Sequence, residues 1–599
     1  MALFLNLGQH YCLMCGIVGF IGKPIKGKII TDALKKLEYR GYDSWGAAFF
    51  SDNKIICFKE VGSIGKIPEE IQGINSSLAV GHTRWATHGK ICRENAHPHV
   101  SADNKLTVVH NGIIENFSEL KKTLSNHNFS SDTDSEIVIH LVEEAIDSGK
   151  DLLHSVSSAV SLLKGSFSLL VFSSVEPDKL IAVKKESPLL LGISKQGIFA
   201  ASDQIPLSEF TDHFVFLEDG DIALIKKDGF ECFDFSLRPV ERKIIKVESN
   251  ITSSGKLKYS HFMLKEIMEQ PFVLKNVLMQ DKNSFLEIAS LLKEKNIFFV
   301  GNGTSFNACM FGKEFFSRVA GISSQVIEAS EFPYRLEFLP NNSLIFALSQ
   351  SGETADVLDS VKKAKKNGFK IVSLVNVFNS SLARLSDKVI YLNCGEEIGV
   401  ASTKAFTSQV ALLYLLANSC KNNFINALNE LNEVSLKMQE AIESNKDSIK
   451  ELSSKLKSVN DVYFIGRSLN YPVALEASLK LKEISYIHAE AFQAGSLKHG
   501  PLALISDNVP VIVVAPKDRV FNDTINNAIE AKSRGAFIVG VGNENNDCFD
   551  FFIKVPEVNE LLFSLVLILP LQLLAFHTAV FLERNPDKPR NLAKSVTVK

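Results

Sequence analysis

The stretches Ile297–Ser305 (IFFVGNGTS) and Val462–Asn470 (VYFIGRSLN) decide the fold of the C-terminal half, because they are two copies of one pattern. Each is an apolar run that ends in glycine and small polar residues, which is typical of a buried strand leading into a helix. The repeat predicts two doubly wound α/β domains with parallel sheets. Further pairs follow at nearly the same separation: Leu344–Gln350 with Pro510–Pro516, and Ile371–Asn376 with Phe537–Asn543.

The N-terminal part has a different pattern of apolar and polar residues. Over roughly the first 230 residues, short apolar runs alternate with turn residues, which predicts strands. Two helical patterns interrupt them, Thr31–Tyr39 and Asp134–Ala145, so we expect stacked sheets covered by helices. A polar stretch, Val247–Lys258, separates the strand-rich N-terminal part from the repeated C-terminal half and is predicted to be a linker.

Composition excludes several classes of protein. A chain of 599 residues is too long to form a single hydrophobic core and should contain several domains. Its net charge is −3 and its basic residues do not form a stripe, which excludes a nucleic-acid-binding protein. Nine scattered cysteines favour a reducing, cytoplasmic compartment over a disulfide framework. The apolar run Leu561–Leu582 is long enough to span a bilayer, but it contains Pro570, Gln572 and His577 and lacks flanking basic clusters. We expect a fully buried helix there and no membrane association.

Small hydroxyl residues mark a candidate phosphate site in the first repeat. The stretch Leu348–Ala364 (LSQSGETADVLDSVKKA) reads as a strand end, a turn and an amphipathic helix. Hydroxyls and free N–H groups at a helix N-terminus suit phosphate, although a plain N-cap is the alternative. The candidate ligands are Ser349, Gln350, Ser351 and Thr354, with further small polar turns at Gly303–Ser305 and Val400–Lys404.

The densest group of reactive side chains lies in the second repeat, within Ala474–Leu504. Lys480 and Glu483 share one helix face, and His499 stands in a constrained turn before Gly500 and Pro501. The alternative is a surface ion pair worth less than about 1 kcal/mol. Together with a phosphate site, a base and an ammonium suit the enolisation of a phosphosugar.

Ten motifs in order identify a resemblance that covers the chain from Cys15 onward. The chain resembles the glucosamine-6-phosphate synthases, the isomerising glutamine–fructose-6-phosphate aminotransferases. The motifs are CGIVG, LEYRGYDS, HTRWATHG, NAHPH, VHNGIIEN, SQSGETAD, GVASTKAF, LKLKEISYIHAEAF, LKHGPLAL and PRNLAKSVTV.

The resemblance implies an N-terminal-nucleophile αββα glutaminase sandwich followed by two doubly wound sugar-isomerase domains. It implies a homodimer that takes L-glutamine and D-fructose 6-phosphate, with no cofactor and no metal. The expected ranges are 1–14 for a leader, 15–235 for the glutaminase, 236–285 for a linker with connecting helices, 286–426 and 452–590 for the isomerase domains, and 591–599 for a catalytic tail.

The resemblance also implies roles in the glutaminase half. Cys15 would attack the glutamine amide with its own α-amine as base, and Asn111 with Gly112 would form the oxyanion hole. Arg84 would bind the glutamine carboxylate and Asp134 its ammonium, although Thr133–Glu136 also reads as a capping box. Trp85 would gate the path of ammonia. The remaining glutamine-binding candidates are Arg40, Thr87 and His88.

In the isomerase half the resemblance assigns ring opening to His499, contributed by the neighbouring subunit. Lys594 would form an imine with the ketose, and Glu483 would move a proton between C1 and C2 with Lys480 assisting. The sugar-binding candidates are Gly303, Thr304, Ser305, Ser349, Gln350, Ser351, Thr354 and Ser402. The chain departs from the family pattern at Asn302, Trp45 and Ser496.

Three rival functions are weighed against this one. A metallohydrolase could use the crowded His82, His88, His97, His99 and His110, but no acidic ligand in a matching frame accompanies them. A non-catalytic phosphosugar sensor would leave Cys15 unexplained. An amidotransferase with a phosphoribosyl acceptor would need an acidic pyrophosphate loop, which the sequence lacks.

Fourteen residues precede Cys15, and an internal amide nitrogen cannot serve as a base. The segment Met1–Leu13 has no targeting character, since it lacks a basic region and a long apolar run. We therefore expect the working protein to begin at Cys15, either by translation from Met14 with removal of that methionine or by cleavage of a propeptide.

Overall fold

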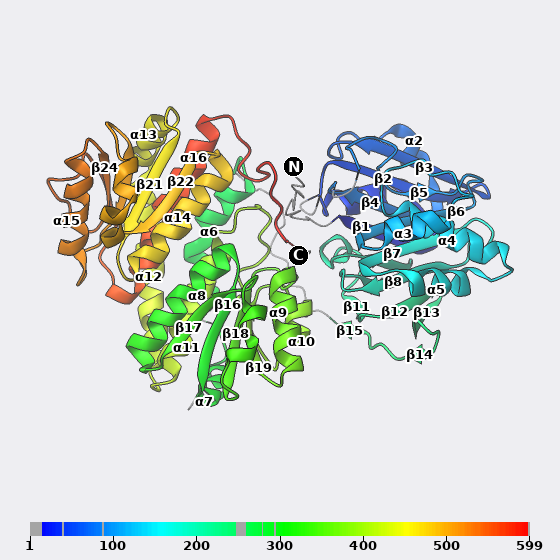
Figure 1. Cartoon of the computed structure of the whole chain (residues 1–599), viewed down its shortest axis with the longest axis horizontal. Coiled ribbons are helices and arrows are strands. Elements are labelled where there is room, and N and C mark those ends of the chain that lie inside the picture. Colours follow the sequence, from blue (N-terminus) through cyan, green and yellow to red (C-terminus); the bar gives the residue numbers. More distant parts are fainter. Residues whose placement is uncertain are drawn as a thin grey trace, which may run out of the picture. The chain divides into compact units, whose positions relative to one another are not determined.

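The computed structural model describes residues 15–38, 41–86, 89–246, 259–277, 279–292 and 295–596. The chain divides into two compact units, one formed mainly by residues 1–250 and the other by residues 251–594 (Figure 1). The expected leader 1–14 and the expected linker Val247–Lys258 lie outside the described residues.

The first unit is built on two antiparallel sheets. The eight-stranded sheet runs β15 (Ile245–Lys246), β11 (His213–Phe216), β9 (Leu190–Ile193), β10 (Gly197–Ala201), β1 (Gly16–Lys26), β4 (Asn75–Arg84), β2 (Ser44–Ser51), β3 (Lys54–Val61). The seven-stranded sheet runs β14 (Pro239–Val240), β13 (Gly229–Asp234), β12 (Asp221–Lys226), β8 (Leu180–Lys185), β7 (Gly165–Ser173), β6 (Leu106–Ile114), β5 (His99–Val100). The helices are α1 (Gly27–Lys35), α2 (Glu69–Gly73), α3 (Phe117–Thr123), α4 (Glu136–Asp147), α5 (Leu152–Leu162) and the short η1 (Ile205–Leu207).

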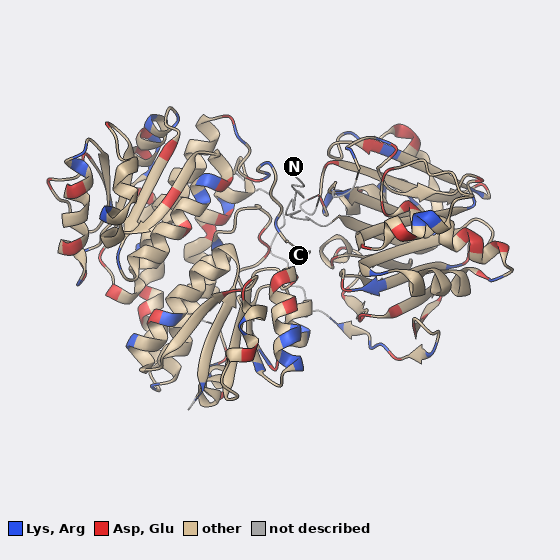
Figure 2. Cartoon of the chain, viewed as in Figure 1, with Lys and Arg blue, Asp and Glu red and all other residues tan. Residues whose placement is uncertain are grey.

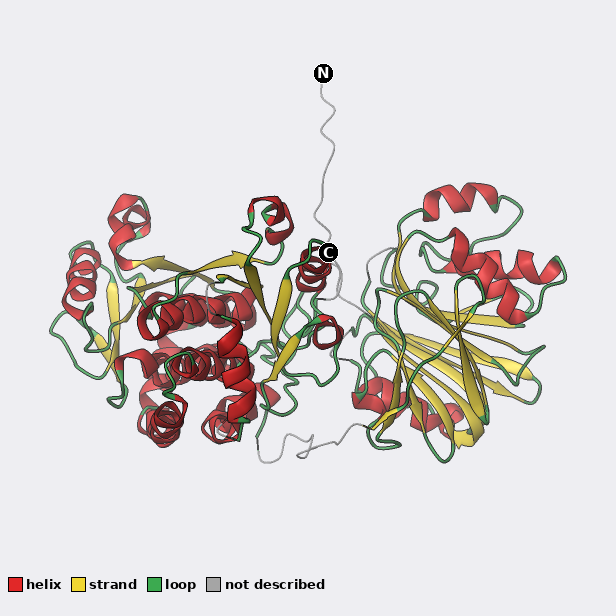
Figure 3. Cartoon of the chain, turned by 90° about the horizontal axis from the view of Figure 1, so that it is seen from below, coloured by secondary structure: helices red, strands yellow, loops and turns green. Residues whose placement is uncertain are grey.

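Alternation along the strands creates four layers. Ile17 and Ile21 of β1 face the second sheet, whereas Val18 and Phe20 pack against α1 and α2. On β7, Leu170 faces the first sheet while the neighbouring side chains pack under α4 and α5. The result is the predicted αββα sandwich, with helices on both outer faces (Figure 3).

The second unit contains two five-stranded parallel sheets with the same order, in which the first strand of each lies between the second and the third. The first sheet runs β17 (Ser324–Glu328), β16 (Asn296–Gly301), β18 (Ser343–Ser349), β19 (Lys370–Val375), β20 (Lys388–Tyr391). The second runs β22 (His488–Gln493), β21 (Asp461–Gly466), β23 (Pro510–Val514), β24 (Phe537–Gly542), β25 (Phe551–Lys554). The repeat therefore predicted both sheets correctly.

Helices fill the space between and around these sheets (Figure 1). They are α6 (Phe262–Val277), α7 (Lys282–Leu291), α8 (Gly303–Phe315), α9 (Ala355–Lys366), α10 (Ser381–Leu385), α11 (Lys404–Ser419), α12 (Phe424–Ser444), α13 (Lys446–Leu456), α14 (Asn470–Ser485), α15 (Phe521–Lys532) and α16 (Phe563–Phe581). Short helical turns are η2 (Phe316–Ala320), η3 (Phe332–Tyr334), η4 (Leu336–Phe338), η5 (Ala494–His499), η6 (Pro501–Leu504) and η7 (Glu560–Leu562).

One apolar core joins the two repeats. It takes in Phe299 and Phe346 from the first sheet, Phe464 from the second, and almost all of α16. By length and composition the segment Glu560–Phe581 could cross a membrane, but 89% of its most apolar window is buried inside the fold. The side-chain oxygen of Gln572 has a partner inside the core, since the side-chain amide of Gln270 donates to Gln572 Oε1 at 2.6 Å. The expected buried helix is confirmed.

Charged side chains of both signs are interspersed over both units (Figure 2). This distribution accords with the net charge of −3. It offers no concentrated basic surface of the kind that attracts a phosphate backbone among the described residues.

We predict that Phe346→Ala destabilises the second unit. Phe346 is fully buried and its ring centroid lies 5.3 Å from Phe299 and 5.8 Å from Phe316. Removing it leaves a cavity that costs about 3–5 kcal/mol, so the midpoint of urea unfolding should fall. Phe338→Ala is the matched control, because Phe338 is 72% exposed and should leave the midpoint unchanged. Equal midpoints for the two variants would contradict this account of the core.

Candidate active sites

The first candidate site lies where β1 begins. The Cys15 sulfur accepts a hydrogen bond from the Trp85 N–H at 3.3 Å and faces the Trp85 carbonyl at 3.6 Å. The next residue, Gly16, has no room for a side chain, because a Cβ there would lie 2.6 Å from the Leu37 Cβ. Burial raises the pKa of the Cys15 thiol to about 11, and the charges of Arg84 and Asp134 also act on it. The structure therefore brings the predicted nucleophile and both predicted glutamine anchors to one place.

Asn111 and Gly112, the two predicted oxyanion-hole residues, are neighbours on β6. Asn111 is fully buried, yet its side-chain amide has no hydrogen-bond partner among the described residues. A buried amide without a partner is costly, which favours a role toward a bound group. Gly112 has φ of +123°, and a Cβ there would lie 2.0 Å from the Ser166 carbonyl oxygen. Only glycine fits this position.

The two predicted glutamine anchors are held by backbone contacts. The Arg84 guanidinium donates to the Lys90 carbonyl at 3.3 Å and to the Gly89 carbonyl at 3.5 Å. Asp134 Oδ2 accepts from the Ile114 N–H at 2.8 Å, which ties the start of α4 to the end of β6. The other glutamine-binding candidates, Arg40, Thr87 and His88, lie outside the described residues.

The alternative interpretation of Thr133–Glu136 as a capping box is wrong. Helix α4 begins at Glu136, and its N-cap Ser135 makes no side-chain capping bond. Thr133 Oγ1 instead contacts His99 Nε2 at 3.0 Å. Glu136 accepts from the backbone N–H groups of Ser130 and Ser131, each at 2.7 Å. Tertiary partners thus replace the local reciprocal bonds.

The described histidines of the rival metallohydrolase hypothesis form hydrogen bonds in the core. His82 Nε2 contacts the His110 carbonyl at 2.9 Å, and His97 Nδ1 accepts from the His110 N–H at 3.3 Å. His97 stacks on His82 with ring centroids 4.1 Å apart. Burial holds the pKa of His82 and of His97 well below the usual range and lowers that of His99 to about 3. Neutral rings with these contacts support β6 and thereby Asn111.

Asp43 is a residue that the motif analysis did not single out. Its Oδ2 accepts from the Ala86 N–H at 2.9 Å, and its carbonyl accepts from the Gly62 N–H at 2.8 Å. These bonds fix the segment that presents the Trp85 N–H to Cys15. Asp43 lies inside the LEYRGYDS motif, so its place in that motif was the available signal.

The second candidate site lies at the carboxyl ends of β16 and β18, where the strand order reverses. This is the position at which open parallel sheets bind ligands. Ser349 Oγ contacts Thr354 Oγ1 at 2.8 Å and accepts from the Gly352 N–H at 3.1 Å. Thr354 is the N-cap of α9 and has no side-chain capping bond. Gln350 and Ser351 complete the same turn.

The neighbouring turn, Gly303–Ser305, opens α8. Ser305 Oγ accepts from Gln409 Nε2 at 3.0 Å. Thr304 Oγ1 accepts from Lys480 Nζ at 3.0 Å and donates to Glu476 Oε1 at 3.0 Å. Thr304 thus joins the first repeat to α14 of the second, which brings the predicted sugar site next to the predicted catalytic helix.

Lys480 is fully buried between two carboxylates. Its Nζ lies 2.5 Å from Glu483 Oε2 and 3.5 Å from Glu476 Oε1. Burial opposes the charged form of Lys480, but the two carboxylates outweigh it and raise its pKa. Burial raises the pKa of Glu476 to about 7. The surface ion pair offered as the alternative is excluded, because the side chain of Lys480 is only 1% exposed.

Lys594 is buried rather than displayed on a free tail. Its ammonium donates to Glu397 Oε2, and its side chain is 4% exposed. Burial opposes ionisation of Glu397, but the charge and hydrogen bond of Lys594 outweigh it and lower the Glu397 pKa to about 2. Ser402 Oγ donates to the same carboxylate at 2.8 Å. The tail is further held by Asp587, which accepts from the Phe262 and Met263 N–H groups at 2.9 and 2.8 Å.

Two acidic residues at this site were missed, Glu397 and Glu266. Glu266 Oε1 accepts from the Ile398 N–H at 2.5 Å and the Gly399 N–H at 3.1 Å. Glu397 accepts from the Thr403 N–H at 2.9 Å and the Ala405 N–H at 3.1 Å. The two carboxylates hold the segment 397–405 that carries Ser402. The sequence spacing of Glu266 and Glu397 from their hydrogen-bond partners follows no recognisable pattern, so sequence analysis could not predict these contacts.

The structure also places His499 and two of the residues that depart from the family pattern, Asn302 and Trp45. His499 ends η5 and is exposed, so it is available to another chain. Asn302 is the N-cap of α8; its Oδ1 accepts from the Ala329 N–H at 3.0 Å. Trp45 is 3% exposed in the core beneath α1.

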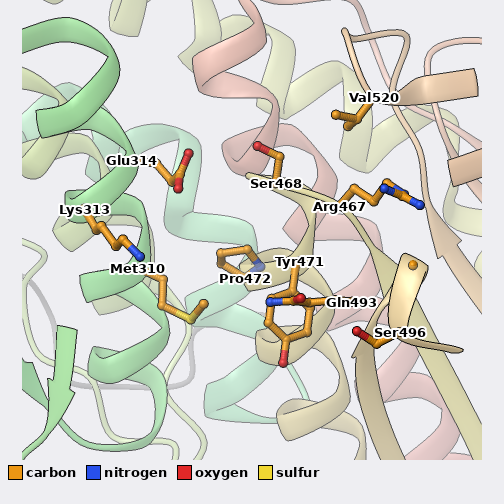
Figure 4. A pocket seen from close by; sticks show the side chains of 11 residues that line it. Met310, Lys313, Glu314, Arg467, Ser468, Tyr471, Pro472, Gln493, Ser496 and Val520 are labelled. Atoms are coloured by element: carbon orange, nitrogen blue, oxygen red, sulfur yellow. The ribbon is translucent and has the colours of Figure 1, made fainter. Parts of the chain in front are cut away.

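A cavity of about 370 Å³ lies at the equivalent edge of the second sheet (Figure 4). Arg467 and Ser468 follow β21, and Ser496 precedes His499 on η5. The Arg467 guanidinium donates to Asn527 Oδ1 at 2.9 Å. The residues predicted to hold the sugar do not line this cavity.

Comparison with known proteins identifies the domain families of both units. Residues 82–209 match the glutamine amidotransferase domain family, and residues 290–419 and 455–581 each match the SIS domain family. The isomerizing glutamine–fructose-6-phosphate aminotransferases of Thermotoga maritima and Thermococcus kodakarensis are 43% and 42% identical to this chain, over 98% of it and all of their own length.

Solved structures match the second unit. The C-terminal domain of the glucosamine-fructose-6-phosphate aminotransferase from Francisella tularensis is 35% identical, with a TM-score of 0.52, and covers 56% of this chain and 100% of its own. The tagatose-6-phosphate ketose/aldose isomerase from Escherichia coli shares the fold at 18% identity, with a TM-score of 0.50, covering 57% of this chain and 99% of its own.

Gly112→Ala is expected to abolish glutamine hydrolysis while the second unit keeps its fold. The new Cβ would collide with the Ser166 carbonyl and displace Asn111. Loss of the oxyanion donor that the resemblance implies at Asn111 should lower kcat by about 100-fold or more. The glutaminase assay gives the rate, and Gly149→Ala is the control, because its φ of +91° is similar but a Cβ there meets nothing within 4 Å. Equal rates for the two variants would show that Gly112 is not constrained as described.

Proposed function

This chain belongs to the isomerizing glutamine–fructose-6-phosphate aminotransferases, and on that basis we propose how its residues divide the reaction. The enzyme converts D-fructose 6-phosphate and L-glutamine to D-glucosamine 6-phosphate and L-glutamate. The observation that carries the division is the presence of two separate constellations, one around Cys15 and one around Lys594 and Lys480. We assign the glutaminase to residues 15–235, the isomerase domains to 286–426 and 452–590, and the catalytic tail to 591–599.

In the glutaminase, the Cys15 sulfur attacks the side-chain amide of glutamine. A thioester forms, ammonia leaves, and water then releases glutamate and restores the thiol. The buried amide of Asn111 without a partner supports its role as a donor to the developing oxyanion, together with the Gly112 N–H. Arg84 binds the substrate carboxylate and Asp134 its ammonium, with Arg40, Thr87 and His88 as further contacts, while Trp85 borders the path by which ammonia leaves.

The attack requires a base, because a thiol with a pKa near 11 is protonated at neutral pH. Both hydrogen-bond contacts of the sulfur among the described residues are backbone atoms of Trp85, and neither can take a proton. The α-amine of Cys15 is the base that we assign, since its ordinary pKa is about 8. This role requires that residues 1–14 be absent from the working enzyme.

In the isomerase, the turn after β18 holds the sugar phosphate. Ser349, Ser351 and Thr354 cluster with Gln350 at the N-terminus of α9, where hydroxyls and N–H groups favour an anion. The turn Gly303–Ser305 and Ser402 face the same strand edge and contribute contacts to the sugar. His499 opens the ring and comes from a second copy of the chain, so the enzyme works as a homodimer.

Lys594 forms an imine with C2 of the open-chain ketose. Its nitrogen gains the C2 bond, the carbonyl oxygen leaves as water, and ammonia then displaces the lysine. Glu397 holds the Lys594 side chain in position for this attack. Glu483 then moves a proton from C1 to C2, and Lys480 stabilises the charge on the neighbouring hydroxyl oxygen.

The described cysteines are all free thiols, which supports a cytoplasmic location for the enzyme.

Cys15→Ala is expected to eliminate glutamine-dependent synthesis but to leave isomerisation of fructose 6-phosphate measurable, because the two constellations are separate. Product assays for glucosamine 6-phosphate and glucose 6-phosphate measure the two reactions. Cys57→Ala is the control, a half-buried cysteine of the same unit that should retain both. A folded Cys15→Ala protein that has lost isomerisation as well would refute the division of labour.

Borohydride reduction in the presence of fructose 6-phosphate should attach the sugar covalently to Lys594, because reduction converts the imine to a stable secondary amine. Peptide mass spectrometry locates the label. Lys588→Arg should still be labelled, whereas Lys594→Arg should not be and should lose synthesis. Labelling of a different lysine, with Lys594→Arg active, would end the imine assignment.

A further inference from the structure

A group of metal-ligand side chains lies outside both sites. His127 follows α3, while His140 and Glu143 stand one turn apart on α4. One ligand atom from each lies within 4.8 Å of the other two. We propose that His127, His140 and Glu143 bind a divalent transition-metal ion of the zinc class. These residues are distinct from the histidines weighed in the sequence analysis, which foresaw no metal.

Two of the three distances between ligand atoms lie within about half an ångström of the value for tetrahedral coordination. Glu143 Oε2 lies 2.8 Å from His140 Nδ1 and 3.6 Å from His127 Nδ1. In a tetrahedral zinc site with bonds of about 2.0–2.1 Å, neighbouring ligand atoms are about 3.3 Å apart. Two imidazole nitrogens and one carboxylate oxygen are a common zinc ligand set, and it leaves a fourth position for water.

The other nitrogen of each ring faces a second carboxylate. His140 Nε2 lies 3.8 Å from Glu136 Oε1, and His127 Nε2 lies 3.5 Å from Glu144 Oε1. Ligating histidines usually direct their second ring N–H at a carboxylate, which orients the ring and raises its basicity. His140 Nε2 has no hydrogen-bond partner among the described residues, although His140 is only 6% exposed. Small adjustments on metal binding would bring this N–H to Glu136.

The site is accessible and connected to the glutaminase. The side chains of His127 and Glu143 are 20% and 23% exposed, so an ion can reach them from solvent. Glu136, which faces His140, also holds Ser130 and Ser131, and the chain continues from there to Asp134. The ion would therefore bind to α4, the helix that begins directly after Asp134, the predicted anchor for the glutamine ammonium.

The competing account is a network of ion pairs that holds no metal, because the same side chains satisfy one another electrostatically. Burial lowers the pKa of His140, but its interactions with Glu136 and Glu143 outweigh burial and raise the pKa to about 9. A metal ion must therefore displace a proton from this ring, and metal titration separates the two accounts.

Metal binding by the full chain tests the proposal. The probes are Co²⁺, followed by its visible absorption in a tetrahedral site, and Zn²⁺, followed by competition with a chromophoric chelator. The variants are His127→Gln and Glu143→Gln. His154→Gln is the matched control, because His154 is an exposed histidine paired with Asp151 at 2.7 Å on α5.

Wild type and His154→Gln should bind one more equivalent of Zn²⁺ than the two cluster variants, or bind it at least about tenfold more tightly. The tetrahedral Co²⁺ absorption should be lost in His127→Gln and Glu143→Gln. Wild-type stoichiometry and affinity in both cluster variants, or no Zn²⁺ bound by wild type, would overturn the proposal and leave the ion-pair network.

Discussion

The sugar half of this enzyme depends on one buried ion pair, Lys594 with Glu397. A single buried charge would be costly, and the pair is tolerable because Glu397 also accepts hydrogen bonds from Ser402, Thr403 and Ala405. The pair fixes the C-terminal tail against the first repeat, while Asp587 fixes the same tail to the start of α6. An exposed lysine would be flexible in water, whereas this one is held in one position by Glu397. The position of the amine that we propose as the nucleophile therefore follows from electrostatics rather than from local sequence.

The glutaminase half solves a different problem, because its nucleophile is neutral and buried. Asp43 holds the segment at Trp85, whose N–H donates a hydrogen bond to the Cys15 sulfur. Neutral histidines that contact β6 support the strand that carries the Asn111 amide. Both halves share a principle: the groups that we propose as catalytic are held by contacts within the protein before substrate arrives, which lowers the cost of reorganisation.

Sequence reasoning predicted the architecture well, since it rests on periodicity and on an internal repeat. The two parallel sheets, the αββα sandwich and the buried helix α16 are confirmed. It predicted the Ser349–Thr354 turn at a helix N-terminus because that feature is local. It failed where partners are distant in the chain. The Thr133–Glu136 capping box does not form, because His99, Ser130 and Ser131 offer tertiary partners. Glu266, Glu397 and Asp587 went unnoticed for the same reason, and so did His127 beside His140. The roles of the individual site residues remain proposals.

The most direct test of the central claim follows the nitrogen. The enzyme is incubated with fructose 6-phosphate and glutamine labelled with nitrogen-15 in the side-chain amide, in a buffer that contains unlabelled ammonium. Mass spectrometry then measures the label in the amino group of glucosamine 6-phosphate. The account predicts that the product carries the label, because we propose that the nitrogen released at Cys15 replaces Lys594 at C2. Unlabelled product, with the label recovered as free ammonium, would contradict it.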